Sequence, residues 1–297
     1  MKNKSSVFYY HAMLIPGVVL LLIFSIMPMF GLIMAFQTFN PILGFFQSPF
    51  VGLDNFKAVF TNSEITQAMY NTLVIAIIKI ILQMLVPITF AILLNECRLL
   101  WFKRGVQTIV YMPFFLSWVI VAEMFSHMFA LNGMVNTMLM ALGFKNPIMF
   151  MASNLWFQPI VIGVDVWKNF GFNAVIYIAA ITGIDPNLYE AADIDGATRW
   201  QKVKFVTLPG IISTVVLLGV LSIGGILNAG FDEIFNMYNP LVYKSGDILD
   251  TLVYRIGIGQ LQYSVGTAVG LFKSVVSFVL ITVSFKLAHK FAGYRIF

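Results

Sequence analysis

Residues 72–95 read TLVIAIIKIILQMLVPITFAILLN, and this stretch decides the fold class. Nearly every residue in it is apolar, and as a helix it would be about 36 Å long at 1.5 Å per residue. A helix needs about 20 mostly apolar residues to cross a hydrocarbon core of about 30 Å. Because every backbone polar group in lipid must be bonded within its own segment, the stretch is predicted to be a transmembrane α-helix.

The rest of the chain repeats this pattern. Of its 297 residues, 59% are hydrophobic and only 10% are charged, whereas a soluble domain is about one quarter charged. We therefore predict an all-α polytopic membrane protein with six transmembrane helices, forming a single domain over residues 1–297. The predicted spans are residues 12–36, 72–95, 106–129, 155–181, 211–231 and 267–288.

The first span could be mistaken for a signal peptide. Residues 12–36 are too many for the apolar core of such a peptide, and no Ala-x-Ala cleavage site follows them. We expect this segment to be retained as the first helix.

Lysines and arginines predict the orientation. With the N-terminus in the cytoplasm, eleven of them fall in inner segments and four in outer segments. Basic residues concentrate on the cytoplasmic side of membrane proteins, so both termini are expected there. The net charge of +5 therefore reflects topology rather than binding to nucleic acid.

Cysteine and histidine usage excludes several kinds of site. Cys97 is the single cysteine, so a disulfide framework within the chain and a Cys-rich metal site are ruled out. His11, His127 and His289 lie far apart and lack metal-ligand spacing, and we expect no metal site.

The inner link 182–210 is long, polar and patterned. Asp185 and Pro186 are typical of a helix start, as N-cap and first helical residue. Gly196 can adopt positive φ and turn the chain. A second short helix is predicted from Ala197 to about Val206, before Pro209 starts the next span.

The first of these helices has an approachable face. Leu188, Ala191, Ala192 and Asp195 share it by their helical spacing. Two interpretations are open on the residues alone. The hairpin can lie on lipid headgroups as an amphipathic surface element, or it can insert into a groove of a partner protein.

A resemblance favours the second interpretation. Glu190-Ala191-Ala192, then Gly196, then Val206-Thr207-Leu208-Pro209 resembles the EAA motif of membrane subunits in binding-protein-dependent ABC importers. Asp195-Gly196-Ala197 matches the usual core of that motif. Val206 departs from it, because the family normally has Ile there.

The resemblance extends over essentially the whole chain. Residues 52–56, Gly-Leu-Asp-Asn-Phe, resemble a segment that follows the first helix in sugar-type permeases. The chain is most similar to maltose-like and polysaccharide-type permeases. This implies the type I importer permease fold, import of a carbohydrate by alternating access, with an oligosaccharide as the expected solute, and a place in the bacterial inner membrane.

The resemblance also implies partners. These are a second, usually non-identical permease, two ATP-binding subunits, an extracytoplasmic solute-binding protein and the surrounding lipid. The chain has no Gly-x-x-x-x-Gly-Lys-Ser/Thr motif, so we expect it to bind no cofactor, with ATP and Mg held by the partner ATPase. The residues implied in ATPase coupling are Glu190, Ala191, Ala192, Asp195, Gly196, Ala197, Leu208 and Pro209.

Five ionisable residues fall within the spans, where they are costly and usually face a cavity or a partner. Asp165 and Lys168 lie about 15 and 20 Å deep and are spaced to pair on one helix face. Lys79, Glu123 and Lys273 lie about 10 Å deep and could reach outward to water. A structural role and a role in a solute pathway are both open for all five.

The candidate pathway adds aromatic and amide side chains that suit sugar rings, although each aromatic can equally be packing or an interface anchor. Three lysines against two acids make the pathway slightly cationic, which would suit an acidic sugar. The candidate residues are Asp165, Lys168, Trp167, Asn173, Tyr177, Glu123, Trp118, Lys79, Gln83, Asn228 and Lys273.

Two other function classes compete with the importer. An ion-coupled secondary transporter would use Asp165 and Glu123 as proton or sodium sites, but the paired repeats with broken helices typical of such folds are not seen. A membrane-embedded enzyme would need a clustered nucleophile, base or metal set, and the sequence offers none. We therefore expect no catalytic residue.

Overall fold

The computed structural model describes residues 4–292, with side chains from Tyr9 to Lys286. The predicted cytoplasmic termini, residues 1–3 and 293–297, lie outside the described residues. The chain divides into two compact units, residues 1–62 with 253–272, and residues 63–252 with 273–297. The single-domain organisation stays a prediction.

The first unit begins with a long apolar helix. It consists of α1 (Lys4–Leu21), a π-helical turn (Leu22–Ile26) and a 3-10 segment (Met27–Phe36), which has Pro28 in its first turn. Short helices follow. They are α2 (Gly44–Gln47), α3 (Asp54–Thr61), a π-helical turn (Arg255–Gly259) and the first part of α15 (Tyr263–Ala292).

The Gly-Leu-Asp-Asn-Phe segment secures the end of this apolar helix. Asn55 donates from Nδ2 to the carbonyls of Ala35 and Gln37, at 3.0 and 2.9 Å. The ring of Phe56 packs on Phe36 with 5.3 Å between centroids. The segment therefore closes the helix end that it follows in sequence.

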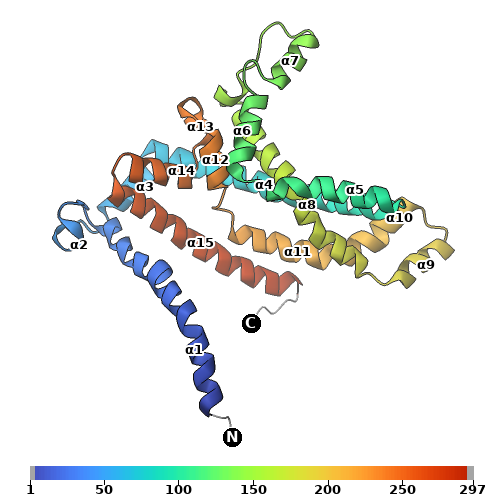
Figure 1. Cartoon of the computed structure of the whole chain (residues 1–297), viewed down its shortest axis with the longest axis horizontal. Coiled ribbons are helices and arrows are strands. Elements are labelled where there is room, and N and C mark those ends of the chain that lie inside the picture. Colours follow the sequence, from blue (N-terminus) through green and yellow to red (C-terminus); the bar gives the residue numbers. More distant parts are fainter. Residues whose placement is uncertain (1–3, 293–297) are drawn as a thin grey trace. The chain divides into compact units, whose positions relative to one another are not determined.

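The second unit is built on two long helices, α4 (Ser63–Glu96) and α8 (Phe157–Thr182), which pack side by side (Figure 1). The remaining α-helices are α5 (Leu100–Tyr111), α6 (Trp118–Met128), α7 (Met134–Ala141), α9 (Pro186–Ile194), α10 (Arg199–Lys202), α11 (Leu208–Gly224), α12 (Phe231–Met237), α13 (Tyr243–Gly246), α14 (Leu249–Tyr254, shared with the first unit) and the rest of α15. Three 3-10 turns lie at Met112–Phe115, Phe150–Ala152 and Pro240–Val242, and a π-helical turn lies at Val203–Thr207.

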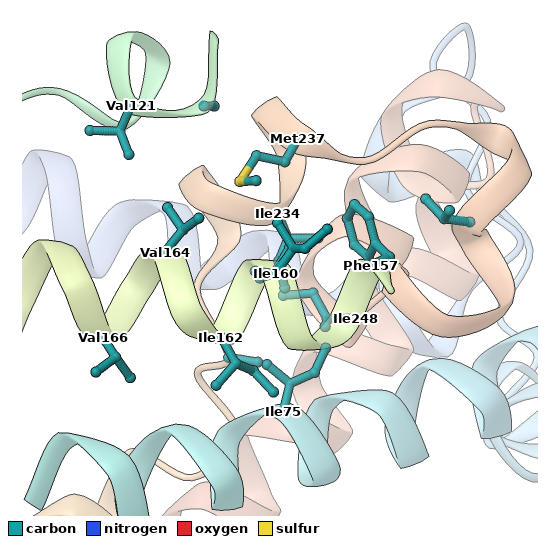
Figure 2. Close-up of a cluster of buried hydrophobic side chains, with 14 of the residues drawn as sticks. Ile75, Val121, Phe157, Ile160, Ile162, Val164, Val166, Ile234, Met237 and Ile248 are labelled. Carbon is teal, nitrogen blue, oxygen red and sulfur yellow. The ribbon is translucent and has the colours of Figure 1, made fainter. Parts of the chain in front are cut away.

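Buried aliphatic side chains join these elements. Figure 2 shows Ile75 of α4 and Ile160 of α8 near Ile234 of α12 and Ile248. All four belong to one buried cluster that also includes Val121 of α6. This core fixes α12 and the segment before α14 against α4 and α8, and so positions the polar residues described below.

Helices lie at all six predicted spans, although two of them differ from the prediction. Four described helices are long and apolar enough to cross a membrane: Tyr9–Phe36, Ser63–Glu96, Arg199–Gly224 and Tyr263–Lys286. A fifth is present if the bent pair Leu100–Phe115 and Trp118–Met128 counts as one span. The stretch predicted at 155–181 forms α8, whose 26 residues give it sufficient length while its polar residues reduce its hydropathy.

The span predicted at 106–129 is not one helix. It breaks between α5 and α6 with a bend of 102°. Pro113 cannot donate a backbone hydrogen bond, and the chain tightens into the 3-10 turn Met112–Phe115. Ser117 then accepts a hydrogen bond from Ile120 N and caps a new helix, so the chain breaks sharply here.

The span predicted at 211–231 also ends early. Its helix begins before residue 211 and stops at Gly224, and a turn carries the chain to α12. Gly230 in this turn has a φ of +100°, which favours glycine. Gly224 and Gly225 follow one another at the end of α11. Because glycine has a low helix propensity, this pair accounts for the early end of the helix.

Candidate functional site

A polar pocket of about 280 Å³ lies between α4, α8 and the turn that joins α11 to α12. Four residues of the predicted pathway line it: Lys79, Gln83, Asp165 and Asn228. They come from three separate parts of the chain, and the fold brings them together.

Lys79 is buried at the edge of this pocket. Its Nζ lies 2.6 Å from Oε2 of Glu233 and donates to the carbonyl of Ala229 at 2.7 Å. Oδ1 of Asp165 lies 4.0 Å away on the other side. The expectation that Lys79 extends outward to water is wrong, because a buried carboxylate on α12 offers the ammonium a full-charge partner nearby.

Amide groups orient Asp165 and extend the network along α8. Gln83 donates from Nε2 to Oδ2 of Asp165 at 3.0 Å, and Asn169 donates to Oδ1 at 2.9 Å. Asn173 in turn donates to Oε1 of Gln83 at 2.5 Å. Both carboxylate oxygens therefore accept from fixed donors, which holds the side chain in one orientation at the pocket.

Lys168 faces a different neighbour. Its Nζ donates to the carbonyl of Phe114 at 2.7 Å and lies over the rings of Phe114 and Trp118, at 5.4 and 5.2 Å from their centroids. Three helical residues rotate Lys168 away from Asp165 by about 60°. Among the described side chains, Lys168 and Asp165 do not form the direct ion pair that their spacing allows, and each residue takes its own partners.

Two aromatic candidates pack rather than line the polar pocket. Tyr177 is 2% exposed and belongs to a buried cluster with Ala91, Ile181 and Ile211. Trp167 contacts Phe125 edge to face, with 5.2 Å between ring centroids.

The last two charged candidates have separate partners. Oε1 of Glu123 lies 2.8 Å from Nε2 of His127, and both side chains are exposed on α6. Lys273 lies 2.5 Å from Asp250 and is mostly buried, so it too does not extend to water.

Sequence reasoning missed Glu233 and Asp250. Both fall in residues 232–266, which the sequence assigns to an outer link, and each partner is found only by folding. One signal was available. Asp232 and Glu233 follow Gly230 at the start of a short apolar helix, and an acid among apolar neighbours needs a cation.

These acids change the charge of the candidate pathway. Lys79 lies between Glu233 and Asp165, and Lys273 is matched by Asp250. The excess of lysines that indicated a cationic pathway is therefore cancelled by residues outside the predicted set. Where side chains are described, no group of three or more His, Cys, Asp or Glu residues could hold a metal ion.

The patterned inner loop forms the helix–turn–helix that the sequence predicts. Asp185 accepts from the backbone N–H of Asn187 at 3.0 Å and caps α9, and Gly196 turns the chain with a φ of +73°. Thr198 caps α10 in a reciprocal pair with Gln201. The apolar side chains of Ile194 and Trp200 are 87% and 74% exposed at this turn.

The second short helix differs from its prediction. It begins after the cap at Thr198 and continues without a break into α11, as one helix from Arg199 to Gly224. Pro209 lies inside this helix rather than starting a new one. The π-helical turn Val203–Thr207 widens the backbone just before it, which relieves the clash between a proline ring and the preceding turn.

Two contacts brace the loop. Lys202 lies 2.7 Å from Asp193, and the Tyr189 hydroxyl lies 2.9 Å from that of Thr207. The first joins α9 to α10 and the second joins α9 to the π-helical turn. The loop therefore forms a folded knob on the continuous helix.

Comparison with known proteins places this architecture. The sequence profile of a family described as "Binding-protein-dependent transport system inner membrane component" matches residues 85–291. Protein LplB of Bacillus subtilis is 40% identical over 95% of this chain and 88% of its own. The polygalacturonan/rhamnogalacturonan transport system permease protein YteP of the same organism is 39% identical with the same coverage.

A solved structure is also similar over nearly the full length. It is a chain of a bacterial ABC transporter involved in the import of the acidic polysaccharide alginate, with a TM-score of 0.89, 36% identity and 97% coverage of both chains. A second structure of a bacterial alginate transporter, in complex with an alginate pentasaccharide-bound periplasmic protein, has the same TM-score and 35% identity.

Proposed function

Because the chain belongs to the family of inner membrane components of binding-protein-dependent transport systems, we propose that it is the permease subunit of an ATP-driven importer of oligosaccharides. The family and the apolar helices make it a multi-pass membrane protein. The observation that carries the proposal is similarity over nearly the whole chain to permeases of polysaccharide transport. The membrane is the bacterial cytoplasmic one, with both termini inside.

The transported solute is an acidic oligosaccharide. This part of the proposal is supported by the relatives named for polygalacturonan and alginate transport, and not by an excess of lysines. In the polar pocket one lysine faces two carboxylates, so the pocket itself does not favour an anion. Binding of the acidic groups is then assigned to other parts of the transporter.

The polar pocket contacts the hydroxyl groups of the passing sugar. Gln83 and Asn228 carry amides that both donate and accept hydrogen bonds, and Asp165 is held by fixed donors with capacity to accept more. A sugar hydroxyl also donates and accepts, so this lining suits hydroxyls. Lys168, Trp118 and Trp167 extend the pathway along α8 and α6.

Energy reaches these residues through the inner loop. The knob formed by α9 and α10 docks in a cleft of a separate ATP-binding subunit, with Glu190, Ala191 and Asp195 among the contacting residues. Small alanines allow close approach, and the exposed Ile194 and Trp200 supply apolar contact area. Closure of the ATPase dimer is a rigid-body motion, and a folded knob transmits such a motion to the transmembrane helices.

The complete transporter contains four kinds of partner around this chain. They are a second homologous permease, two ATP-binding subunits, an external solute-binding protein and the lipid. ATP and Mg bind to the ATP-binding subunits. The transport cycle is alternating access, in which ATP-driven closure opens the spans outward and hydrolysis resets them.

Uptake measurements with loop variants test the proposal. Glu190→Lys reverses a charge on the docking face, and Gly196→Pro imposes a φ of about −65° where the loop needs +73°. Both variants are expected to reach the membrane and to lose uptake of labelled oligouronate. Thr108→Ala on α5 is the control and keeps uptake. Normal uptake by both loop variants contradicts the docking role.

Purification in mild detergent tests the assembly separately. The wild-type chain should bring down an ATPase and a second permease, and Glu190→Lys should lose the ATPase while retaining the permease.

Competition experiments test the solute class. Acidic oligosaccharides should compete with uptake of the labelled oligouronate, and competition by neutral sugars only would contradict an acidic solute.

A further inference from the structure

A second, apolar pocket of about 530 Å³ lies between α6, α7 and the first turns of α8. A continuous row of rings forms one wall. Phe125, Phe129, Phe150 and Trp156 follow one another with centroid separations of 6.2, 5.4 and 5.5 Å. Aliphatic side chains complete the lining, and the polar residues of the other pocket take no part in it.

The wall of this pocket is held by a buried amide. Asn136 of α7 accepts from the backbone N–H of Ile148 at 2.8 Å and donates to the carbonyls of Ala130 and Ile148, at 3.0 and 2.9 Å. These bonds fix residues 130–148 as a rigid cover beside the ends of α6 and α8. The pocket is therefore pre-formed, as ligand sites usually are.

Water is a poor occupant of such a space. A buried water needs two to four polar partners, and the lining is almost entirely apolar. The innermost lining residue on α8, Val164, lies seven residues after Phe157, which is about 10 Å along the helix. The pocket thus lies at the outer end of the predicted span 155–181, where the neighbouring medium is expected to change from water to hydrocarbon.

A cation lies next to the lining. Lys145 is exposed and directly follows Phe144, which is part of the pocket wall. A lysine ammonium forms charge-assisted hydrogen bonds with phosphate oxygens, so it suits the headgroup of a phospholipid. We propose that this pocket holds an acyl chain of one phospholipid, whose phosphate is bound at Lys145.

The proposal is tested with the full-length protein purified in detergent, stripped of lipid and given phosphatidylglycerol. Retained lipid is counted by native mass spectrometry. Gly163 lines the pocket and has open space around its missing side chain, so Gly163→Leu should fill the pocket without disturbing the helix. Lipid retention should fall about tenfold or more, because the leucine side chain takes up space that the acyl chain needs, and the pocket could hold both only if it were overpacked.

Gly105→Leu is the matched control, since it adds the same side chain to an exposed helical glycine with open space on α5. It should retain lipid like the wild type. Equal retention by the Gly163→Leu variant, or no retained lipid on the wild type, would overturn the proposal, and would assign the pocket to a protein partner or to detergent.

A surface variant tests the headgroup without touching the pocket. Lys145→Glu should weaken retention of phosphatidylglycerol but leave retention of diacylglycerol, which lacks phosphate, unchanged. Lys57→Glu, at another exposed lysine, should change neither. If Lys145→Glu leaves both lipids bound as in the wild type, the assignment of the phosphate to Lys145 is wrong.

Discussion

At the scale of single residues, the ion cluster of Lys79 is the most constrained part of the molecule. Glu233 is 1% exposed, and Lys79 is its nearest cation, at 2.6 Å. Removing one partner of a buried pair leaves a charge without compensation, which costs far more than the pair itself contributes. The cluster therefore acts as a structural bond between α4 and α12 as well as a border of the polar pocket.

Lys79→Met should destabilise the protein by about 3–5 kcal/mol, because it leaves the Glu233 carboxylate buried beside Asp165. Thermal unfolding in detergent measures the effect as a fall in Tm. The double variant Lys79→Met/Glu233→Gln should recover much of the loss. Lys57→Met, which breaks the exposed pair with Asp54, should leave Tm nearly unchanged. Equal effects of Lys79→Met and Lys57→Met would contradict the structural role.

This cluster also marks a limit of sequence analysis. Lys79, Gln83, Asp165 and Asn228 were predictable as pathway candidates because each is polar within an apolar stretch. Glu233 was not, because it is 154 residues from Lys79 and falls in a segment that reads as a loop. Hydropathy finds the costly residue, but the partner that makes it tolerable depends on which helices pack together.

At the scale of elements, local signals in the inner loop were sufficient for its first helix and its turn, but not for the extent of its second helix. Asp185-Pro186 and Gly196 predict a helix start and a turn, and the structure has both. Proline was ambiguous. Pro87 lies inside the unbroken 34-residue helix α4, whereas Pro113 ends a helix. The difference is that Ser117 follows Pro113 and caps a new helix, so a break there loses fewer hydrogen bonds.

Packing of α8 against α5 depends on a glycine. A Cβ added to Gly171 would meet the backbone carbonyl of Val110, whereas one added to Gly163 on the same helix meets nothing. Gly171→Ala should therefore lower stability by about 1–3 kcal/mol, and Gly163→Ala should be neutral or slightly stabilising. Thermal unfolding of the two variants side by side is the measurement, and identical Tm values would contradict the close approach.

The cap at Thr198 is predicted to matter for energy coupling. Thr198→Ala removes the reciprocal hydrogen bonds with Gln201 and should destabilise the helix start by about 1 kcal/mol. We expect stimulation of the ATPase by the loaded binding protein to fall, with an unchanged amount of transporter in the membrane. Thr108→Ala, which removes only a hydroxyl bonded to its own helix, provides the reference. Full stimulation in the Thr198 variant would exclude this role.

At the scale of the whole molecule, topology is the main prediction. The single cysteine, Cys97, lies in a turn that the basic residues place in the cytoplasm. A membrane-impermeant maleimide should leave it unlabelled in intact cells and label it after permeabilisation. Phe46→Cys in a Cys97→Ser background adds a fully exposed thiol on the predicted outer side, which should react in intact cells. If Cys97 is labelled in intact cells and the Phe46→Cys thiol reacts only after permeabilisation, the topology is the opposite of the predicted one.

The continuous helix from Arg199 to Gly224 has a mechanical consequence. Its 26 residues make a rod about 39 Å long, with no hinge other than the wider turn at Val203–Thr207. One end carries the knob, and the other ends at Gly225, in the wall of the polar pocket. Because the two ends belong to one continuous helix, a tilt imposed at Thr198 also displaces the wall of the polar pocket.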